Sequence, residues 1–94
     1  VSDDEASVLI KEIEGWHLIN DGVKKLKKEF NFSSYSDSKD FTNKVADMAD
    51  LEDHHPQIIL EWGKVTVSWL SHKIKGLQKN DFICAAKTNN ISKN

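Results

Sequence analysis

Residues 54–72 read HHPQIILEWGKVTVSWLSH, and this stretch predicts a β-hairpin with histidines at both of its ends. Residues 57–62 and residues 65–70 each alternate between two sets of side chains, which is typical of β-strands. Gly63-Lys64 between them suits a two-residue turn of type II′, which prefers glycine in its first position. Because a tight hairpin returns the chain to its starting end, we expect the histidines at the two ends to lie close together.

Three of the four histidines of the chain, His54, His55 and His72, therefore form one predicted cluster. Histidine exchanges protons near neutral pH, so a cluster of this kind suits acid–base catalysis. Pro56 forces His55 into an extended conformation, so the adjacent rings must point in different directions. Either they line two sides of a pocket, or one ring faces the pocket while the other braces it. Adjacent histidines in a loop are also common as plain surface residues.

Two chemistries remain open for this cluster. Three neutral imidazoles could bind zinc with one open position, as in a zinc hydrolase. Metal-free proton transfer is the alternative, and it is favoured because adjacent residues are awkward ligands for a single metal. Nearby acids could orient the rings or fix their tautomers, and these are Asp50, Glu52, Asp53 and Asp81.

The other patterns complete the domain. They predict a helix over residues 3–14, strands over 16–19 and 26–32, and helices over about 36–51 and 79–88. The first helix begins with the capping-box pattern of Ser2 and Glu5. We expect residues 89–94 to be a frayed tail.

The order of these elements, α-β-β-α-β-β-α, indicates an α+β fold. We predict a two-layer sandwich in which a four-stranded antiparallel sheet carries three helices on one face. The 94 residues suffice for a single domain, residues 1–94.

The amino-acid composition limits the kinds of partner and the surroundings that we expect for this protein. All 13 basic residues are lysine, and with a net charge of −2 this argues against direct binding to nucleic acid. No apolar run approaches the roughly 20 residues that a membrane span needs. The single cysteine, Cys84, fits a reducing compartment and a buried apolar position. We therefore expect a cytoplasmic protein.

Five short motifs follow one another in the second half of the chain: Asp53-His54-His55-Pro56, residues 62–67 (WGKVTV), Ser71-His72-Lys73, Gly76-Leu77 and Asn80-Asp81-Phe82. Their order and spacing resemble the pterin-4α-carbinolamine dehydratase family. The resemblance covers roughly residues 15–87, and it includes the interval of eighteen residues between His54 and His72.

The resemblance implies dehydration of 4a-hydroxytetrahydrobiopterin to quinonoid dihydropterin, in tetrahydrobiopterin recycling, without a metal or a redox cofactor. It implies that His54, His55 and His72 are catalytic. The substrate-binding residues that it implies are Asp50, Asp53, Pro56, Leu70, Ser71, Lys73 and Asp81. Asp50 stands where the family often has glutamate, which is one methylene longer, so any contact of this acid is open.

Three further expectations follow from the residues together with the resemblance. His54, backed by the acidic stretch 50–53, is the expected acid, His72 the expected base, and His55 chiefly positions the pterin. The protein should be a homo-oligomer, a dimer or tetramer, with part of the last helix at an interface. Animal members also serve as dimerisation cofactors of a homeodomain transcription factor, so an interaction module, with nuclear residence possible, is the alternative function.

Overall fold

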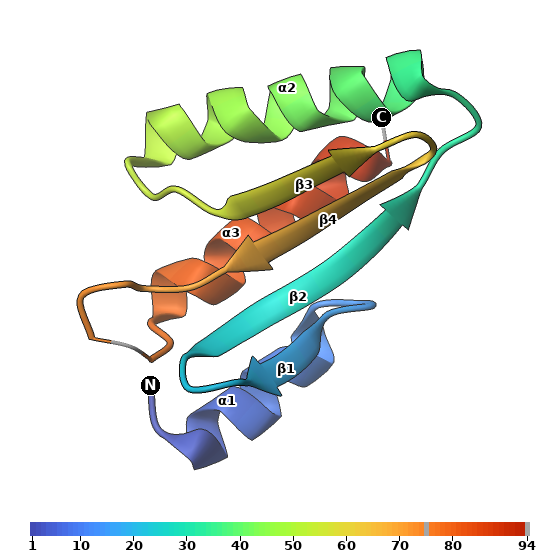
Figure 1. Cartoon of the computed structure of the whole chain (residues 1–94). Helices are drawn as coiled ribbons and strands as arrows, with labels where there is room; N and C mark the ends of the chain where they lie inside the picture. Colours follow the sequence, from blue (N-terminus) through green and yellow to red (C-terminus); the bar gives the residue numbers. More distant parts are fainter. Residues whose placement is uncertain (75, 94) are drawn as a thin grey trace.

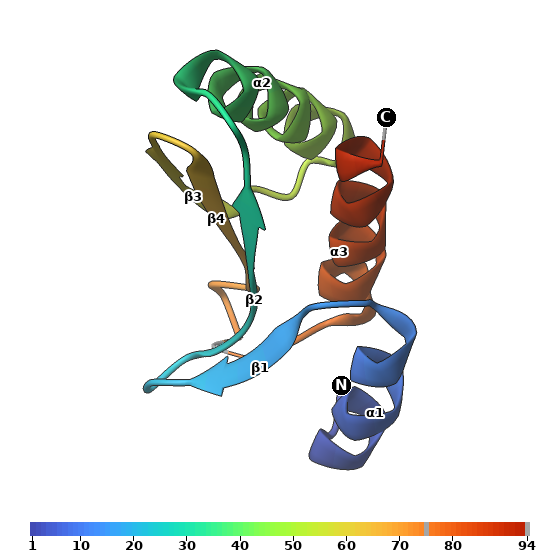
Figure 2. The same ribbon diagram turned by 90° about the vertical axis from the view of Figure 1, so that its right-hand side faces the viewer.

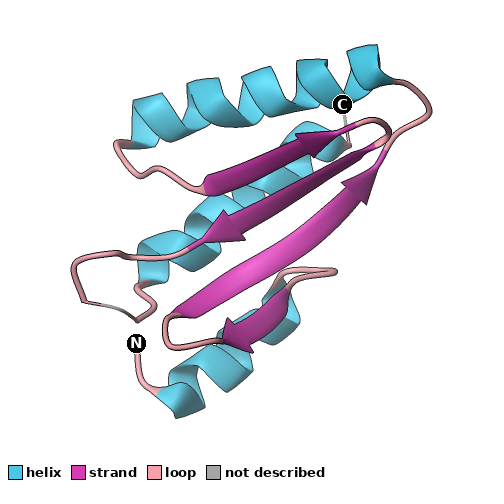
Figure 3. Ribbon diagram, viewed as in Figure 1, coloured by secondary structure: helices cyan, strands magenta, loops and turns pink. Residues whose placement is uncertain are grey.

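The computed structural model describes residues 1–74 and 76–93. Along the chain it contains α1 (Asp3–Leu9), a 3₁₀ turn (Ile10–Glu12), β1 (His17–Asn20), β2 (Lys24–Asn31), α2 (Tyr35–Glu52), β3 (Gln57–Glu61), β4 (Lys64–Trp69) and α3 (Lys79–Ser92). The strands form one sheet in the order β1-β2-β4-β3, and every neighbouring pair is antiparallel (Figures 1 and 3).

The helices lie on one side of this sheet, as the view along its edge shows (Figure 2). The α+β sandwich with helices on one face, predicted from the sequence, is therefore confirmed. Within the described residues, no helix combines the length and the apolar character needed to cross a membrane.

Alternation along β2 places its apolar side chains under the helices. Leu26 and Phe30 are buried, whereas Lys27 and Glu29 between them are exposed on the open face. The neighbouring strand β4 is central in the sheet and is buried on both faces from Val65 onward. This buried strand carries the chain directly to the segment with the third histidine of the predicted cluster.

The last helix is longer than predicted. It was expected to end near Thr88, but α3 continues to Ser92, so the expected frayed tail is wrong for residues 89–92. Asn89 explains the extension, because this buried side chain accepts hydrogen bonds from Trp16 Nε1 (3.0 Å) and Lys28 Nζ (2.8 Å). Residue 94 lies outside the described residues.

The turn of the central hairpin lies one residue earlier than predicted. Glu61 pairs with Lys64, so the turn consists of Trp62 and Gly63. Gly63 is its second residue and has a φ of 73°, whereas a type II′ turn needs the positive φ in its first position. The two strands are nevertheless paired as predicted, and the hairpin returns the chain to its starting end (Figure 1).

The first helix is also shorter than predicted. Its capping box is present, since Ser2 Oγ accepts from Glu5 N (3.1 Å) and Glu5 Oε1 accepts from Ser2 N (3.2 Å). However, α1 ends at Leu9 and a 3₁₀ turn follows to Glu12. Such tightening is common in the last turn of a helix.

Candidate active site

One wall of the candidate site begins where α2 ends. Asp53 caps this helix in the left-handed conformation, with φ 49° and ψ 41°, which is uncommon for a residue other than glycine. The His54 N–H still bonds to Ala49 O at 3.2 Å, so the chain turns sharply out of the helix. Pro56 then starts the extended course into β3. This break places both adjacent histidines at the end of the sheet.

The second wall is the loop that follows β4 (Figure 1). Its residue Ser71 pairs with Gly76 in an isolated antiparallel bridge, which closes the base of the loop. A cavity of about 290 Å³ lies between the two walls, close to the lower end of the size range of small-molecule pockets. It is lined by Asp53, His54, His55, Leu70, Ser71, His72, Lys73 and Gln78.

His54 is the most firmly held of the three histidines. Its Nε2 lies 2.5 Å from Oδ1 of Asp81, a side chain that is fully buried. Its ring stacks on Trp69, with the centroids 5.4 Å apart and the planes at 24°. One edge and one face of the His54 ring are thus fixed by the protein.

Asp81 connects this histidine to the start of α3. Its second oxygen, Oδ2, accepts hydrogen bonds from Ser71 Oγ (2.9 Å) and from the backbone N–H of Gln78 (2.8 Å). Gln78 is the N-cap of α3, so Asp81 sits in the first turn, where a carboxylate is favoured by the helix dipole. The predicted start of this helix at residue 79 is correct.

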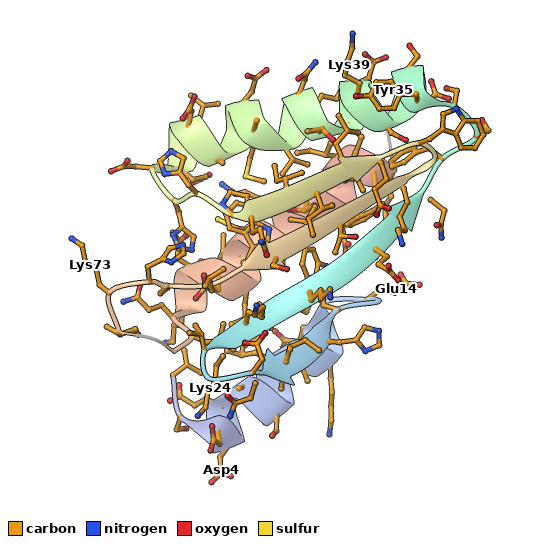
Figure 4. The ribbon with its side chains drawn as sticks, in the orientation of Figure 1. Asp4, Glu14, Lys24, Tyr35, Lys39 and Lys73 are labelled. Atoms are coloured by element: carbon orange, nitrogen blue, oxygen red, sulfur yellow. The ribbon has the colours of Figure 1, made fainter. Side chains whose placement is uncertain are left out.

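His55 and His72 are more accessible. His55 Nε2 lies 3.1 Å from Oδ1 of Asp50, and both side chains are exposed. The shorter side chain of Asp50 therefore still reaches a histidine. His72 is exposed and has no hydrogen-bond partner among residues 1–74 and 76–93. Next to it, Lys73 extends away from the loop (Figure 4).

The structure brings most of the predicted residues together. The three histidines, Asp53, Leu70, Ser71 and Lys73 line the cavity. Asp50 and Asp81 do not line it, but each pairs with one histidine. Pro56 does not line the cavity, and its role is to turn the chain into β3. The expected backing of His54 by the acidic stretch 50–53 is wrong in detail, because the acid that holds His54 is Asp81.

Some features of the site were not predicted. Glu52, considered as an acid near the histidines, forms an ion pair with Lys87 of α3 instead. Trp69 was predicted only as a strand residue, and its contact with His54 depends on the way the two walls meet. Gln78, the N-cap of α3, was missed as well, because glutamine is not among the residues typical of an N-cap. Among residues 1–74 and 76–93, no group of three or more His, Cys, Asp or Glu side chains could hold a metal ion.

Cys84 is an apolar core residue, as the sequence predicted. It is fully buried, and burial raises the pKa of its thiol to about 11, with a further contribution from the negative charges of Glu52 and Asp81. A thiol with this pKa is protonated at neutral pH, so Cys84 is not an activated nucleophile.

Comparisons with known proteins agree with this fold. A family model described as Pterin 4 alpha carbinolamine dehydratase matches residues 1–91. The chain therefore belongs to the pterin-4-alpha-carbinolamine dehydratase family, and it is a hydro-lyase of that class.

Similar proteins include two bacterial sequences named "Putative pterin-4-alpha-carbinolamine dehydratase". The one from Vibrio vulnificus (strain YJ016) is 55% identical over 84 residues, which are 88% of this chain and 76% of the relative. The one from Marinobacter nauticus is 51% identical over 92 residues, 97% of this chain and 83% of the relative.

A solved structure has the same fold. The crystal structure of a transcriptional coactivator/pterin dehydratase from Brucella melitensis has a TM-score of 0.90 at 26% identity. It covers 98% of this chain and 97% of its own.

Proposed function

We propose that this protein dehydrates 4a-hydroxytetrahydrobiopterin to quinonoid dihydropterin by histidine acid–base catalysis, in tetrahydrobiopterin recycling. The observation that carries the proposal is the meeting of three histidines at one cavity, two of them paired with carboxylates. The single buried cysteine fits a reducing compartment, and this supports the cytoplasm as the proposed place of action.

The chemistry needs two proton transfers. The C4a–OH bond breaks when a proton reaches the departing hydroxyl, which leaves as water. A second proton leaves a ring nitrogen of the pterin, whose electrons form the new double bond, so the reaction involves no net oxidation or reduction. A positioned general acid or base typically contributes about 10²–10⁴-fold to a rate.

The geometry supports different tasks for the three rings. His54 is held by Asp81 and is the proposed acid, since a ring fixed on one edge presents its other nitrogen in a constant direction. His72 has no partner among the described residues, so its ring nitrogens are open to the pterin, and it is the proposed base. His55, paired with Asp50 at the surface, positions the pterin.

A dehydration assay of the purified protein tests the proposal. We expect His72→Ala to lower kcat about 10²–10⁴-fold, because the proposed base is lost. Since His72 is exposed, the free energy of unfolding should change by no more than about 0.5 kcal/mol.

The matched control is His17→Ala, because His17 is an exposed histidine on β1 and does not line the cavity. Its turnover should equal that of the unaltered protein. If the unaltered protein dehydrates the substrate no faster than buffer, the proposed activity is wrong. Equal losses in the two variants would refute the assignment of His72.

A second candidate function is that of an interaction module. The similar structure from Brucella melitensis is named a transcriptional coactivator as well as a pterin dehydratase, and this observation favours a dual role. Under this proposal the chain binds a protein partner and makes no direct contact with nucleic acid. An inactive protein that retains specific partner binding would favour the module over the enzyme.

We also propose a homo-oligomer, a dimer or tetramer. On α3, Phe82, Cys84 and Ala85 are buried within the chain, but the side chain of Ile83 remains 50% exposed. Leu51 at the end of α2 is 87% exposed. These apolar side chains are available for an interface between copies. Light scattering at micromolar concentration should give at least twice the mass of one chain, and the mass of one chain would contradict the proposal.

A further inference from the structure

Ser71 lies at the beginning of the loop after β4, and its side chain contacts Asp81 in the first turn of α3. Its side chain is 7% exposed, and its Oγ donates a hydrogen bond of 2.9 Å to Asp81 Oδ2. The bridge to Gly76 fixes the backbone of Ser71 as well. Although Ser71 lines the cavity, its hydroxyl is thus already committed to a residue behind the wall.

The two oxygens of Asp81 have separate partners. Oδ2 accepts from the Ser71 hydroxyl and from the Gln78 N–H, whereas Oδ1 contacts only Nε2 of His54 within the described part of the chain. An ionised carboxylate is purely an acceptor of hydrogen bonds. The His54 nitrogen that faces it must therefore carry a proton in both the neutral and the charged ring. When the ring is neutral, Nδ1 is left as the nitrogen that can take up a proton.

We propose that Ser71 is a positioning residue for the dehydration, which acts through Asp81 to hold His54 as its Nε2–H tautomer and to leave Nδ1 for exchange with the pterin. The proposal rests on the proposed function, because it assigns Ser71 to the chemistry at His54 and not to contact with substrate. Without the Ser71 hydroxyl, Oδ2 keeps one donor, and the carboxylate is free to rotate away from the His54 edge. The ring then samples both tautomers.

The test compares Ser71→Ala with the conservative variant Ser71→Thr, which retains a hydroxyl. We expect Ser71→Ala to lower kcat about tenfold, the effect of one hydrogen bond to a charged group, while KM stays nearly unchanged. Ser71→Thr should restore most of the turnover. Ser68→Ala is the matched control, since Ser68 is a buried serine on β4 that lies outside the cavity lining.

The second readout is the tautomer itself, observed by long-range ¹H–¹⁵N NMR of the His54 ring at a pH where the ring is neutral. In the unaltered protein and in Ser71→Thr, Nε2 should be protonated and Nδ1 unprotonated, whereas Ser71→Ala should show a mixture. A protonated Nδ1 in the unaltered protein would overturn the proposal, as would an unchanged tautomer and kcat in Ser71→Ala. A raised KM at constant kcat would also overturn it, because that result assigns Ser71 to substrate contact.

This readout does not depend on activity. If the unaltered protein fails to dehydrate the pterin, the proposed function is refuted, while the spectra still decide whether Ser71 controls the tautomer of His54. If Ser71→Ala does not fold, Ser71→Val takes its place, because valine has the shape of threonine without the hydroxyl, and its spectrum should show the mixture of tautomers.

Discussion

Asp81→Asn is expected to lower kcat at least about 10²-fold while the protein stays folded. The amide oxygen of asparagine can accept the hydrogen bonds from Ser71 and Gln78, but its NH₂ group then faces His54. An NH₂ group donates, so Nε2 of His54 must become the acceptor and the proton moves to Nδ1. The ring keeps its place, but its charged form becomes unfavourable, because a protonated Nε2 and the asparagine NH₂ group would then be two donors facing each other.

The accompanying variant Asp81→Ala tests how much this carboxylate contributes to the stability of the fold, apart from its effect on the reaction. It removes the partner of three donors and the acid in the first turn of α3, so the free energy of unfolding should fall by on the order of 3 kcal/mol. Denaturant unfolding measures this loss, and Asp81→Asn should lose about 1 kcal/mol. Asp47→Asn on the exposed face of α2 is the control and should affect neither quantity. Full turnover in Asp81→Asn would refute the role of this carboxylate.

His54→Ala is the second substitution with a large expected effect. Loss of the proposed acid should lower kcat about 10²–10⁴-fold. Besides this loss of activity, the structure predicts a cost in stability. Without the imidazole, Asp81 keeps a buried carboxylate oxygen with no partner, and the stacking surface of Trp69 is uncovered. The free energy of unfolding should therefore fall by on the order of 2 kcal/mol.

His55→Ala provides the matched comparison, because the two histidines are adjacent in the sequence and both pair with an aspartate. His55 and Asp50 are both exposed, so the change in stability should stay within about 0.5 kcal/mol. Denaturant midpoints of the two variants measured side by side check this difference. Equal destabilisation would show that the buried position of Asp81 has no energetic consequence.

The sequence predicted the fold well because its signals are local. Alternation in β2 and β4, together with the capping box of Ser2 and Glu5, marks elements that form largely from neighbouring residues. The predictions were wrong where contacts between residues distant in the sequence determine where an element ends. The extension of α3 beyond Thr88 depends on Asn89 binding Trp16, and the position of the hairpin turn depends on the register of two strands.

In the candidate site, too, one feature was predictable from the sequence and others were not. The meeting of the three histidines follows from the hairpin alone and was predictable. The carboxylate that pairs with His54 was not predictable. Proximity in the sequence favoured the stretch 50–53, whereas Asp81 belongs to another element, α3. The stacking on Trp69 likewise arises only when β4 and the end of α2 lie side by side.

The bond between His54 and Asp81 spans 27 residues of sequence, and the chain between them includes β3 and β4. Contacts of this kind form only after the entropy of closing the intervening loop has been overcome. No isolated segment of the protein can hold the histidine in its working orientation. The site is therefore a product of complete folding, and a partly folded chain would retain its helices and its histidines without being a catalyst.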